Sequence, residues 1–305
     1  MKKILIVYNP DSGRGKAEKY AVKIKAAIEA KGLSAELFKS LKKQSVTEYF
    51  QGLTAEARPD SIIIVGGDGT VSSAVNAMLN AGHNIPLALF GHGTANDFSG
   101  YLKTNRRVSK FIKLFSAETY IESDVMLVNG RIYAVSSAGG GAFTNGVSRY
   151  NPTGKRLFGK AAYYFKAVGA AIAMKPQSAR MTVDGETADA SVHLFLAVNS
   201  ANVGGLKNIA KGAFIDDGKL NIIAVKKCGF FGKLALAFSL LTRRTVYNKR
   251  VIYKTGKEVR FELTEDIITK NFTKPDIDGE GEAEFPLNIK VSDKKILVLT
   301  VPSKR

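Results

Sequence analysis

Short apolar runs separated by polar, glycine-containing segments fill the first part of the chain. Runs of this kind, bounded by turn-forming residues, are typical of buried strands, and they cover residues 4–8, 61–65 and 86–90. A further strand is predicted at residues 35–38. Helical segments lie between them at residues 17–31 and 71–79. Strands that alternate with helices predict a parallel, doubly wound sheet, in which ligands bind at the carboxyl ends of the strands.

The pattern changes after residue 124, where hairpin signals and alternating apolar and polar positions replace the strand–helix alternation. Asn129-Gly130 indicates a hairpin within residues 125–135. Further strands are predicted at 180–183, 191–198, 220–225, 251–253, 258–263, 287–291 and 296–301, with helices near 163–174 and 231–241. We therefore expect an α/β nucleotide-binding domain over residues 1–127. A mostly antiparallel β domain over 128–305 follows, and its last strand is a candidate to return to the first domain.

The charge of the chain indicates an anionic partner. Its 305 residues include 45 Lys and Arg against 27 Asp and Glu, a formal net charge of +18. Such an excess suits nucleic acid, an anionic membrane or phosphorylated substrates, although solubility alone also explains it. The sequence shows neither a helix-turn-helix nor an aromatic RNA-binding motif, so no nucleic-acid partner is expected.

Cysteine content and hydropathy bear on location. The single cysteine, Cys228, cannot form a disulfide within the chain, and a reducing compartment fits. The apolar run at residues 4–8 is too short for the core of a signal peptide. The apolar stretches 161–174 and 234–241 are interrupted by lysine or too short to cross a bilayer, so membrane contact is expected to be peripheral.

The segment Gly66-Gly67-Asp68-Gly69-Thr70 carries the clearest chemical signal. It joins a buried strand to a helix, and that geometry presents backbone N–H groups to phosphate. A carboxylate at Asp68 repels phosphate unless a cation lies between them, which points to a metal-bound nucleotide. The alternative is an ordinary strand-to-helix turn in which Asp68 or Thr70 is the N-cap. The spacing matches neither the P-loop nor the dinucleotide-binding glycine motif.

These five residues resemble the signature of the diacylglycerol kinase catalytic-domain family. That family includes bacterial lipid kinases and is related to sphingosine and ceramide kinases, but NAD kinases share the signature. A second element, Gly93-Thr94-Ala95-Asn96-Asp97-Phe98, resembles the G-T-x-N-D-F element of the lipid kinases, which NAD kinases lack at this position. The resemblance covers nearly the whole chain and agrees with the two-domain layout.

The resemblance implies a kinase that uses ATP and Mg²⁺. The residues that match its nucleotide-binding elements are Asn9, Pro10, Ser12, Gly13, Ser40, Gly66, Gly67, Asp68, Gly69, Thr70, Gly93, Thr94 and Asn96. Asp68, Asp97 and Asp124 match a network of carboxylates, water and Mg²⁺, although Asp124 fits a structural role at a strand end equally well. Asp217, with the carbonyls of Phe214 and Lys219, matches a second, structural Mg²⁺ site.

Asp-Gly-Glu occurs twice, at residues 184–186 and 278–280. Asp-Gly is a common hairpin pair, so turn chemistry alone explains either copy. The family places its catalytic copy late, after an element that resembles Asp216-Asp217-Gly218-Lys219-Leu220. Asp278 and Glu280 therefore resemble the catalytic pair, one of them the general base, and the earlier copy is interpreted as an ordinary hairpin.

The expected substrate is a diacylglycerol-like lipid, and the expected product is of the phosphatidic acid type. Cations and aromatic residues flank the helices predicted near 163–174 and 231–241, which suits an anionic membrane surface unless both helices are core. The expected location is therefore cytoplasmic, at the inner face of the membrane. The sequence is compatible with a homodimer. The alternatives are an NAD kinase and a non-catalytic nucleotide-binding module at the membrane.

Overall fold

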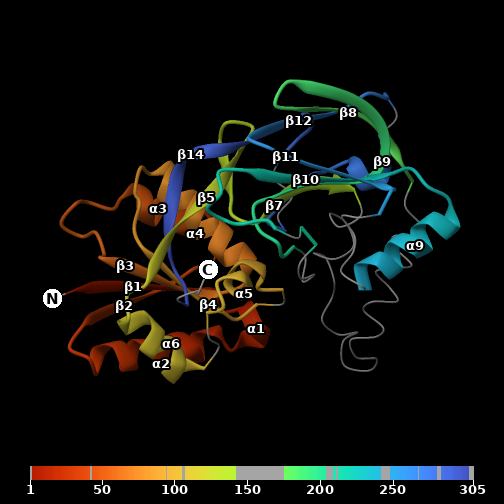
Figure 1. The fold of residues 1–305 in the computed structure, drawn as a ribbon. Coiled ribbons are helices and arrows are strands. Elements are labelled where there is room, and N and C mark those ends of the chain that lie inside the picture. The colour runs from red at the N-terminus through yellow and green to blue at the C-terminus, as the bar shows by residue number, and fades with distance from the viewer. Residues whose placement is uncertain are drawn as a thin grey trace. The chain divides into compact units, whose positions relative to one another are not determined.

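The computed structural model contains two compact units (Figure 1). The first consists of Met1–Val125, Arg131–Val135 and Ser292–Arg305, and the second of Met126–Gly130 and Ser136–Val291. The residues that the structure describes are 2–41, 43–93, 95–104, 107–141, 175–203, 209–210, 212–241, 248–266, 268–279 and 283–301.

The first unit is built on a parallel sheet. Its strands are β1 (Lys3–Tyr8), β2 (Ser34–Lys39), β3 (Ser61–Gly66) and β4 (Leu87–Gly91), in the order β4-β3-β1-β2. The last part of β14 (Leu287–Leu299) adds a further parallel strand, with Val298 opposite Leu87 in β4. β1 and β3 are buried along almost their whole length, as expected for strands covered on both faces.

Helices cover both faces of this sheet (Figure 1). The helices of the unit are α1 (Ser12–Gly15), α2 (Ala17–Glu29), α3 (Lys43–Gln51), α4 (Asp68–Asn80), α5 (Asp97–Tyr101) and α6 (Val108–Ser116). α3 packs against α4 on one face, and α2 packs against α6 on the other. β5 (Tyr120–Val128) begins in this unit, and β6 (Ile132–Ala134) packs against α4.

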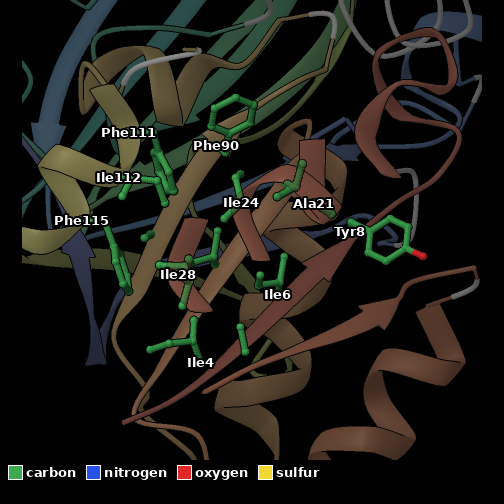
Figure 2. Close-up of a cluster of buried hydrophobic side chains, with 14 of the residues drawn as sticks. Ile4, Ile6, Tyr8, Ala21, Ile24, Ile28, Phe90, Phe111, Ile112 and Phe115 are labelled. Atoms are coloured by element: carbon green, nitrogen blue, oxygen red, sulfur yellow. The ribbon is translucent and has the colours of Figure 1, made fainter. Parts of the chain in front are cut away.

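A cluster of buried side chains joins the sheet to α2 and α6. Figure 2 shows Ile4 and Ile6 of β1 beside Ile24 and Ile28 of α2. Phe111 of α6 joins the cluster and meets Phe90 of β4 edge-on, with 5.3 Å between ring centroids. This packing fixes the strands, and therefore the loops at their carboxyl ends.

The second unit is mostly antiparallel. Its elements are β7 (Ser137–Gly141), β8 (Gln177–Val183), β9 (Glu186–Val198), β10 (Leu220–Lys226), α9 (Phe230–Leu241), β11 (Val251–Gly256), β12 (Glu258–Leu263), a short 3-10 helix η3 (Lys270–Phe272) and β13 (Asp276–Ile277). The strand order is β11-β10-β9-β8-β12 followed by the first part of β14, and β7 pairs with both β9 and β13. Phe195 of β9 stacks on Phe261 of β12, with ring centroids 4.1 Å apart, at the centre of its core.

The parallel and antiparallel sheets confirm the fold class that the hydrophobic pattern predicts. Several details differ. The pattern predicts separate strands at residues 287–291 and 296–301, but a single strand, β14, continues through the polar residues between them. α4 begins at Asp68 rather than at residue 71, which places that carboxylate in the first helical turn. The helix predicted near 163–174 lies outside the described residues.

Candidate active site

The turn after β1 is closed by its own side chains. Asn9 Oδ1 accepts a hydrogen bond from the backbone N–H of Asp11 at 2.9 Å, and the Asn9 carbonyl accepts one from Ser12 at 3.1 Å. Gly13 has a φ of +60°, and a Cβ added there would overlap the His92 side chain and backbone. Position 13 therefore requires glycine for two reasons: its positive φ, and the close approach of the loop after β4.

The turn after β2 lies at the same edge of the sheet. The backbone N–H of Ser40, in the turn after β2, donates a hydrogen bond to the carbonyl of Tyr8, the last residue of β1, at 2.8 Å. Pro10 lies two residues further along, in the turn after β1. Ser40 is buried. The ends of β1 and β2 are thus tied together, as adjacent parallel strands allow.

The glycines after β3 make room for the loop after β4. A Cβ on Gly67 would lie 3.0 Å from Gly93 Cα, and a Cβ on Gly93 would overlap Gly67 Cα. A Cβ on Gly66 would lie 2.5 Å from Thr70 Oγ1. These glycines let the two loops meet backbone to backbone, and Gly69 continues the segment into the first turn of α4.

Asp68 joins the glycine-rich segment to α5. Its Oδ1 accepts a hydrogen bond from the backbone N–H of Phe98 at 3.3 Å. Burial raises the pKa of the Asp68 carboxyl above its ordinary value of 3.8, while hydrogen bonds from the backbone of Phe98, Asn96 and Asp97 oppose that shift. A partly buried carboxylate at a helix N-terminus is thus held by backbone donors from the neighbouring loop.

Asn96 shapes that neighbouring loop. It is only 3% exposed and adopts a left-handed conformation with φ 56°. Its Oδ1 accepts a hydrogen bond from the Gly93 N–H at 2.6 Å, and its Nδ2 donates one to the Gly93 carbonyl at 2.8 Å. This reciprocal pair closes the loop after β4 and presents Asp97 as the first residue of α5. Thr94, another residue of the matched element, lies outside the described residues.

Asp124 lies in β5 and is 1% exposed. Its Oδ1 is 3.4 Å from Lys295 Nζ, a partner in β14 that the sequence analysis does not single out. The two alternatives for Asp124, a member of the Mg²⁺ network and a structural group, therefore both stay open. Sequence separation explains why the pair is missed, because Lys295 belongs to a strand that joins β5 only in the folded chain.

Asp278 occupies a tight turn in the second unit. Its Oδ1 accepts hydrogen bonds from the backbone N–H groups of Ser136 and Ser137, at 2.8 and 2.9 Å. Its own N–H donates to the Ser137 carbonyl at 2.9 Å. Asp278 has a φ of 52° and is 6% exposed, so its side chain and backbone both fix the turn after β13. Glu280, the other member of this predicted pair, lies outside the described residues.

The earlier Asp-Gly-Glu copy has a similar local geometry. Asp184 has a φ of 46°, and its Oδ1 accepts hydrogen bonds from the N–H groups of Lys257 and Glu258, each at 2.9 Å. Glu186 forms an exposed ion pair with Lys254 at 2.9 Å. Asp184 therefore does more than close an ordinary hairpin, because it also fixes the turn between β11 and β12. The two copies differ in burial, since Asp278 is buried and Asp184 is exposed.

The turn around Asp217 is exposed. Asp217 Oδ1 accepts a hydrogen bond from the Lys219 N–H at 2.9 Å, which forms a local side-chain turn. The Phe214 side chain is exposed as well. A second Mg²⁺ site at these residues stays a prediction. Among the described residues no group of three or more His, Cys, Asp and Glu side chains is placed to hold a metal ion.

The contacts show one functional candidate that the sequence left unassigned. The His92 side chain lies against Gly13, and the backbone N–H of His92 donates to the Gly66 carbonyl at 2.7 Å. Its ring also meets Tyr20 of α2 edge-on, with 4.5 Å between centroids. His92 therefore touches the turns after β1 and β3 at once. The available signal was the position of His92 in the loop that follows the strand predicted at residues 86–90.

These features define an α/β unit with a glycine-rich carboxyl edge, followed by an antiparallel β unit. The family described as "Diacylglycerol kinase catalytic domain" matches residues 3–128. The family described as "YegS C-terminal NAD kinase beta sandwich-like domain" matches residues 134–300, which is more than half of the chain. The chain therefore belongs to the diacylglycerol kinase family of lipid kinases, as the two sequence elements predict.

Relatives of full length support this assignment. A diacylglycerol kinase of Bacillus subtilis (strain 168) is 26% identical over 291 residues, covering 94% of this chain and 92% of the relative. One of Staphylococcus carnosus (strain TM300) is 24% identical over 288 residues, covering 94% and 91%. The solved structure of a diacylglycerol kinase from Bacillus anthracis str. Sterne has a TM-score of 0.78 and 23% identity, covering 99% of this chain and 98% of that one. At that identity the structural likeness shows the fold.

Proposed function

We propose that this protein transfers the γ-phosphate of ATP to the hydroxyl of a diacylglycerol-like lipid, giving a product of the phosphatidic acid type. The observation that carries the proposal is the setting of Asp68. Its carboxylate lies in the first turn of α4, in the glycine-rich segment, and accepts a hydrogen bond from Phe98 in the element that separates lipid kinases from NAD kinases.

The carboxyl edge of the parallel sheet supplies the nucleotide site in this proposal. Phosphate oxygens would be bound by backbone N–H groups of the turn after β1 and of the first turn of α4, where the helix dipole favours negative charge. Gly13, Gly67 and Gly93 let the turns at this edge approach each other closely, because a Cβ at any of them would meet the neighbouring loop. Ser40 and Asn96 hold the neighbouring turns in place, and Thr94 would contribute its hydroxyl.

The donor set at this edge suits Mg²⁺. Magnesium ions are usually bound by one or two carboxylates together with water and substrate phosphates, rather than by a complete cage of side chains. Asp68 and Asp97 would supply those carboxylates. When bound, Mg²⁺ neutralises charge on the phosphates, which is a main term in phosphoryl transfer.

The acceptor hydroxyl needs a base within hydrogen-bond reach. We assign Asp278 and Glu280 to this step, with different tasks. Asp278 Oδ1 already accepts two backbone hydrogen bonds, from Ser136 and Ser137, so this carboxylate oxygen is engaged in holding the turn. Asp278 would therefore order the turn, and Glu280 would accept the proton of the lipid hydroxyl.

A lipid acceptor requires contact with a membrane. None of the described helices is long and apolar enough to cross one. The net charge of +18 favours an anionic surface, so we propose peripheral attachment to the inner face of the cell membrane.

The experiment that tests the proposal offers several acceptors to one enzyme preparation. The protein is incubated with Mg²⁺ and ATP labelled at the γ-phosphate, with a total lipid extract in one reaction and NAD in another. Label in a phosphatidic acid supports the proposal. Label in NADP would instead identify an NAD kinase, and absence of transfer in both reactions would favour a non-catalytic nucleotide-binding module.

A further inference from the structure

Helix α9 (Phe230–Leu241) presents apolar side chains to solvent in the second unit. Phe231 is 82% exposed, the highest value among the large apolar side chains that the structure describes. Phe230 is 57% exposed and Leu234 is 50% exposed. Successive helical residues are rotated by about 100°, so these three side chains share one side of the helix. Figure 1 shows α9 at the margin of the unit, beyond the ends of β9 and β10.

The opposite side of α9 is the one that packs. Gly232, Leu236 and Ser239 are buried. A Cβ on Gly232 would lie 2.7 Å from Cys228 Cβ and 2.8 Å from Arg250 Nε, so this part of the helix rests closely on its neighbours. The exposed apolar side is therefore not the core side of an amphipathic helix, and its exposure is not explained by the packing of the unit.

The sequence around α9 is strongly basic. From Lys219 to Lys257, both included, there are ten Lys and Arg residues and no Asp or Glu. Lys226, Lys227 and Lys249 are exposed, and the backbone N–H of Lys226 donates to the Arg250 carbonyl at 2.8 Å. Cations thus lie on both chain segments next to the amino end of the helix.

We propose that the exposed side of α9 inserts Phe230, Phe231 and Leu234 into the interfacial layer of an anionic bilayer, while the surrounding cations bind lipid headgroups. Aromatic and aliphatic side chains on one side of a helix flanked by Lys and Arg suit that interface. The charge argues against a second copy of this chain as the occupant. A two-fold contact would bring the same cations of both copies together. The inference rests on the proposed lipid kinase function, because attachment through α9 would bring the enzyme to its insoluble acceptor.

The absence of tryptophan from the chain allows a direct test. Phe231→Trp introduces the only tryptophan at the proposed point of insertion, and Val22→Trp places one on α2, where Val22 is likewise exposed. Each variant is mixed with vesicles of phosphatidylcholine, with or without phosphatidylglycerol, and with lipids brominated on the acyl chains. We expect a blue shift and bromine quenching for Phe231→Trp on anionic vesicles, and neither for Val22→Trp.

Substitutions separate the apolar and electrostatic contributions. Phe231→Gln/Leu234→Gln should reduce partition into anionic vesicles at least about tenfold, whereas Val22→Gln should leave it unchanged. Lys226→Gln/Lys227→Gln should reduce partition into anionic vesicles by roughly fivefold for each charge removed, and this reduction should be smaller at high salt. Lys19→Gln/Lys23→Gln removes equal charge from α2 and serves as the control. Thermal unfolding checks that each variant is folded.

Activity is measured separately on a short-chain diacylglycerol dissolved as monomers. We expect Phe231→Gln/Leu234→Gln to keep wild-type turnover on that substrate and to lose activity only on diacylglycerol in vesicles. A protein that binds anionic vesicles while Phe231→Trp stays unquenched would overturn the assignment of α9, as would absence of vesicle binding. Loss of partition together with loss of a dimer in sedimentation would identify a second copy as the occupant. Failure of the kinase proposal would appear differently, as no turnover on either substrate.

Discussion

Asp68 Oδ1 accepts a hydrogen bond from the backbone N–H of Phe98 at 3.3 Å, between residues 30 positions apart in the chain. Phe98 is the second residue of α5, so Asp68 satisfies a donor at the start of a helix other than its own. This contact gives Asp68 a structural task in addition to the metal-binding task that we propose. Substitutions at this position can separate the two.

Asp68→Asn and Asp68→Ala should both abolish phosphoryl transfer, but they should differ in stability. Asn keeps an oxygen for the Phe98 N–H, whereas Ala leaves that donor without its acceptor, at a cost of about 1–3 kcal/mol. Urea unfolding should therefore place Asp68→Asn within about 1 kcal/mol of the wild type and Asp68→Ala clearly below it. Retained lipid phosphorylation in Asp68→Asn would remove the metal-binding role.

The buried setting of Asp68 also predicts how stability depends on pH. Burial raises the pKa of this carboxyl in the folded protein, so the folded state holds its proton more tightly than the unfolded state. The contribution of Asp68 to stability is therefore present at low pH and is lost as the pH rises through the folded pKa. As the pH rises above about 4, where the carboxyl of the unfolded chain ionises, the free energy of unfolding of the wild type should fall relative to that of Asp68→Asn. A relative rise would show that hydrogen bonding outweighs burial.

The contact between Gly67 and Gly93 predicts a sharp difference between two alanine substitutions. Gly93→Ala would place a Cβ on the Gly67 backbone, and we expect it to cost about 1–3 kcal/mol and most of the activity. Gly100 in α5 has no heavy atom within 4 Å of an added Cβ and keeps an ordinary φ. Gly100→Ala should be neutral or slightly stabilising, by up to about 1 kcal/mol. Thermal unfolding and turnover are measured for both variants. Equal stability and activity of the two would contradict the predicted contact between Gly67 and Gly93.

The two Asp-Gly-Glu copies should respond in opposite ways. Asp278→Asn/Glu280→Gln should remain folded and lose phosphoryl transfer, because the proton of the acceptor hydroxyl loses its base. Asp184→Asn/Glu186→Gln should keep its activity. The asparagine side chain in this variant still offers an oxygen to the N–H groups of the turn between β11 and β12, so we expect a stability loss of no more than about 1 kcal/mol.

Steady-state kinetics with circular dichroism on both double variants provides the measurement. Because the two copies have similar local hydrogen bonding, each variant is the matched control for the other. Activity lost only in the Asp184 variant would show that the catalytic role was assigned to the wrong copy.

The sequence predicted the sheet of the first unit well, since β1, β3 and β4 are nearly continuous apolar runs bounded by turns. It missed α6, although residues 108, 111, 112 and 115 have helical spacing and pack on the core. It also divided β14, because the polar residues Ser292–Lys295 resemble a turn. In the folded chain β14 pairs with both β4 and β12, and this pairing sustains the strand through its polar centre.

The candidate site was less predictable than the fold. Local spacing singled out Asp68 and the glycines, because a strand, a glycine turn and a helix are contiguous in sequence. It gave no sign of the amides that hold Asp278, since Ser136 and Ser137 lie more than a hundred residues earlier. Local turn propensity also could not show that Asp184 binds backbone donors in a distant turn.

The most direct measurement of the central claim is transfer of labelled γ-phosphate to diacylglycerol in mixed micelles, with wild type and Asp68→Asn compared in the presence and absence of Mg²⁺. We predict labelled phosphatidic acid with the wild type and Mg²⁺. The rate of transfer should fall by several orders of magnitude when Asp68 is replaced by Asn or when Mg²⁺ is omitted, since charge neutralisation dominates phosphoryl transfer. Equal amounts of labelled lipid from the two proteins would contradict the role of Asp68. Label in added NAD rather than in lipid would contradict the lipid kinase function.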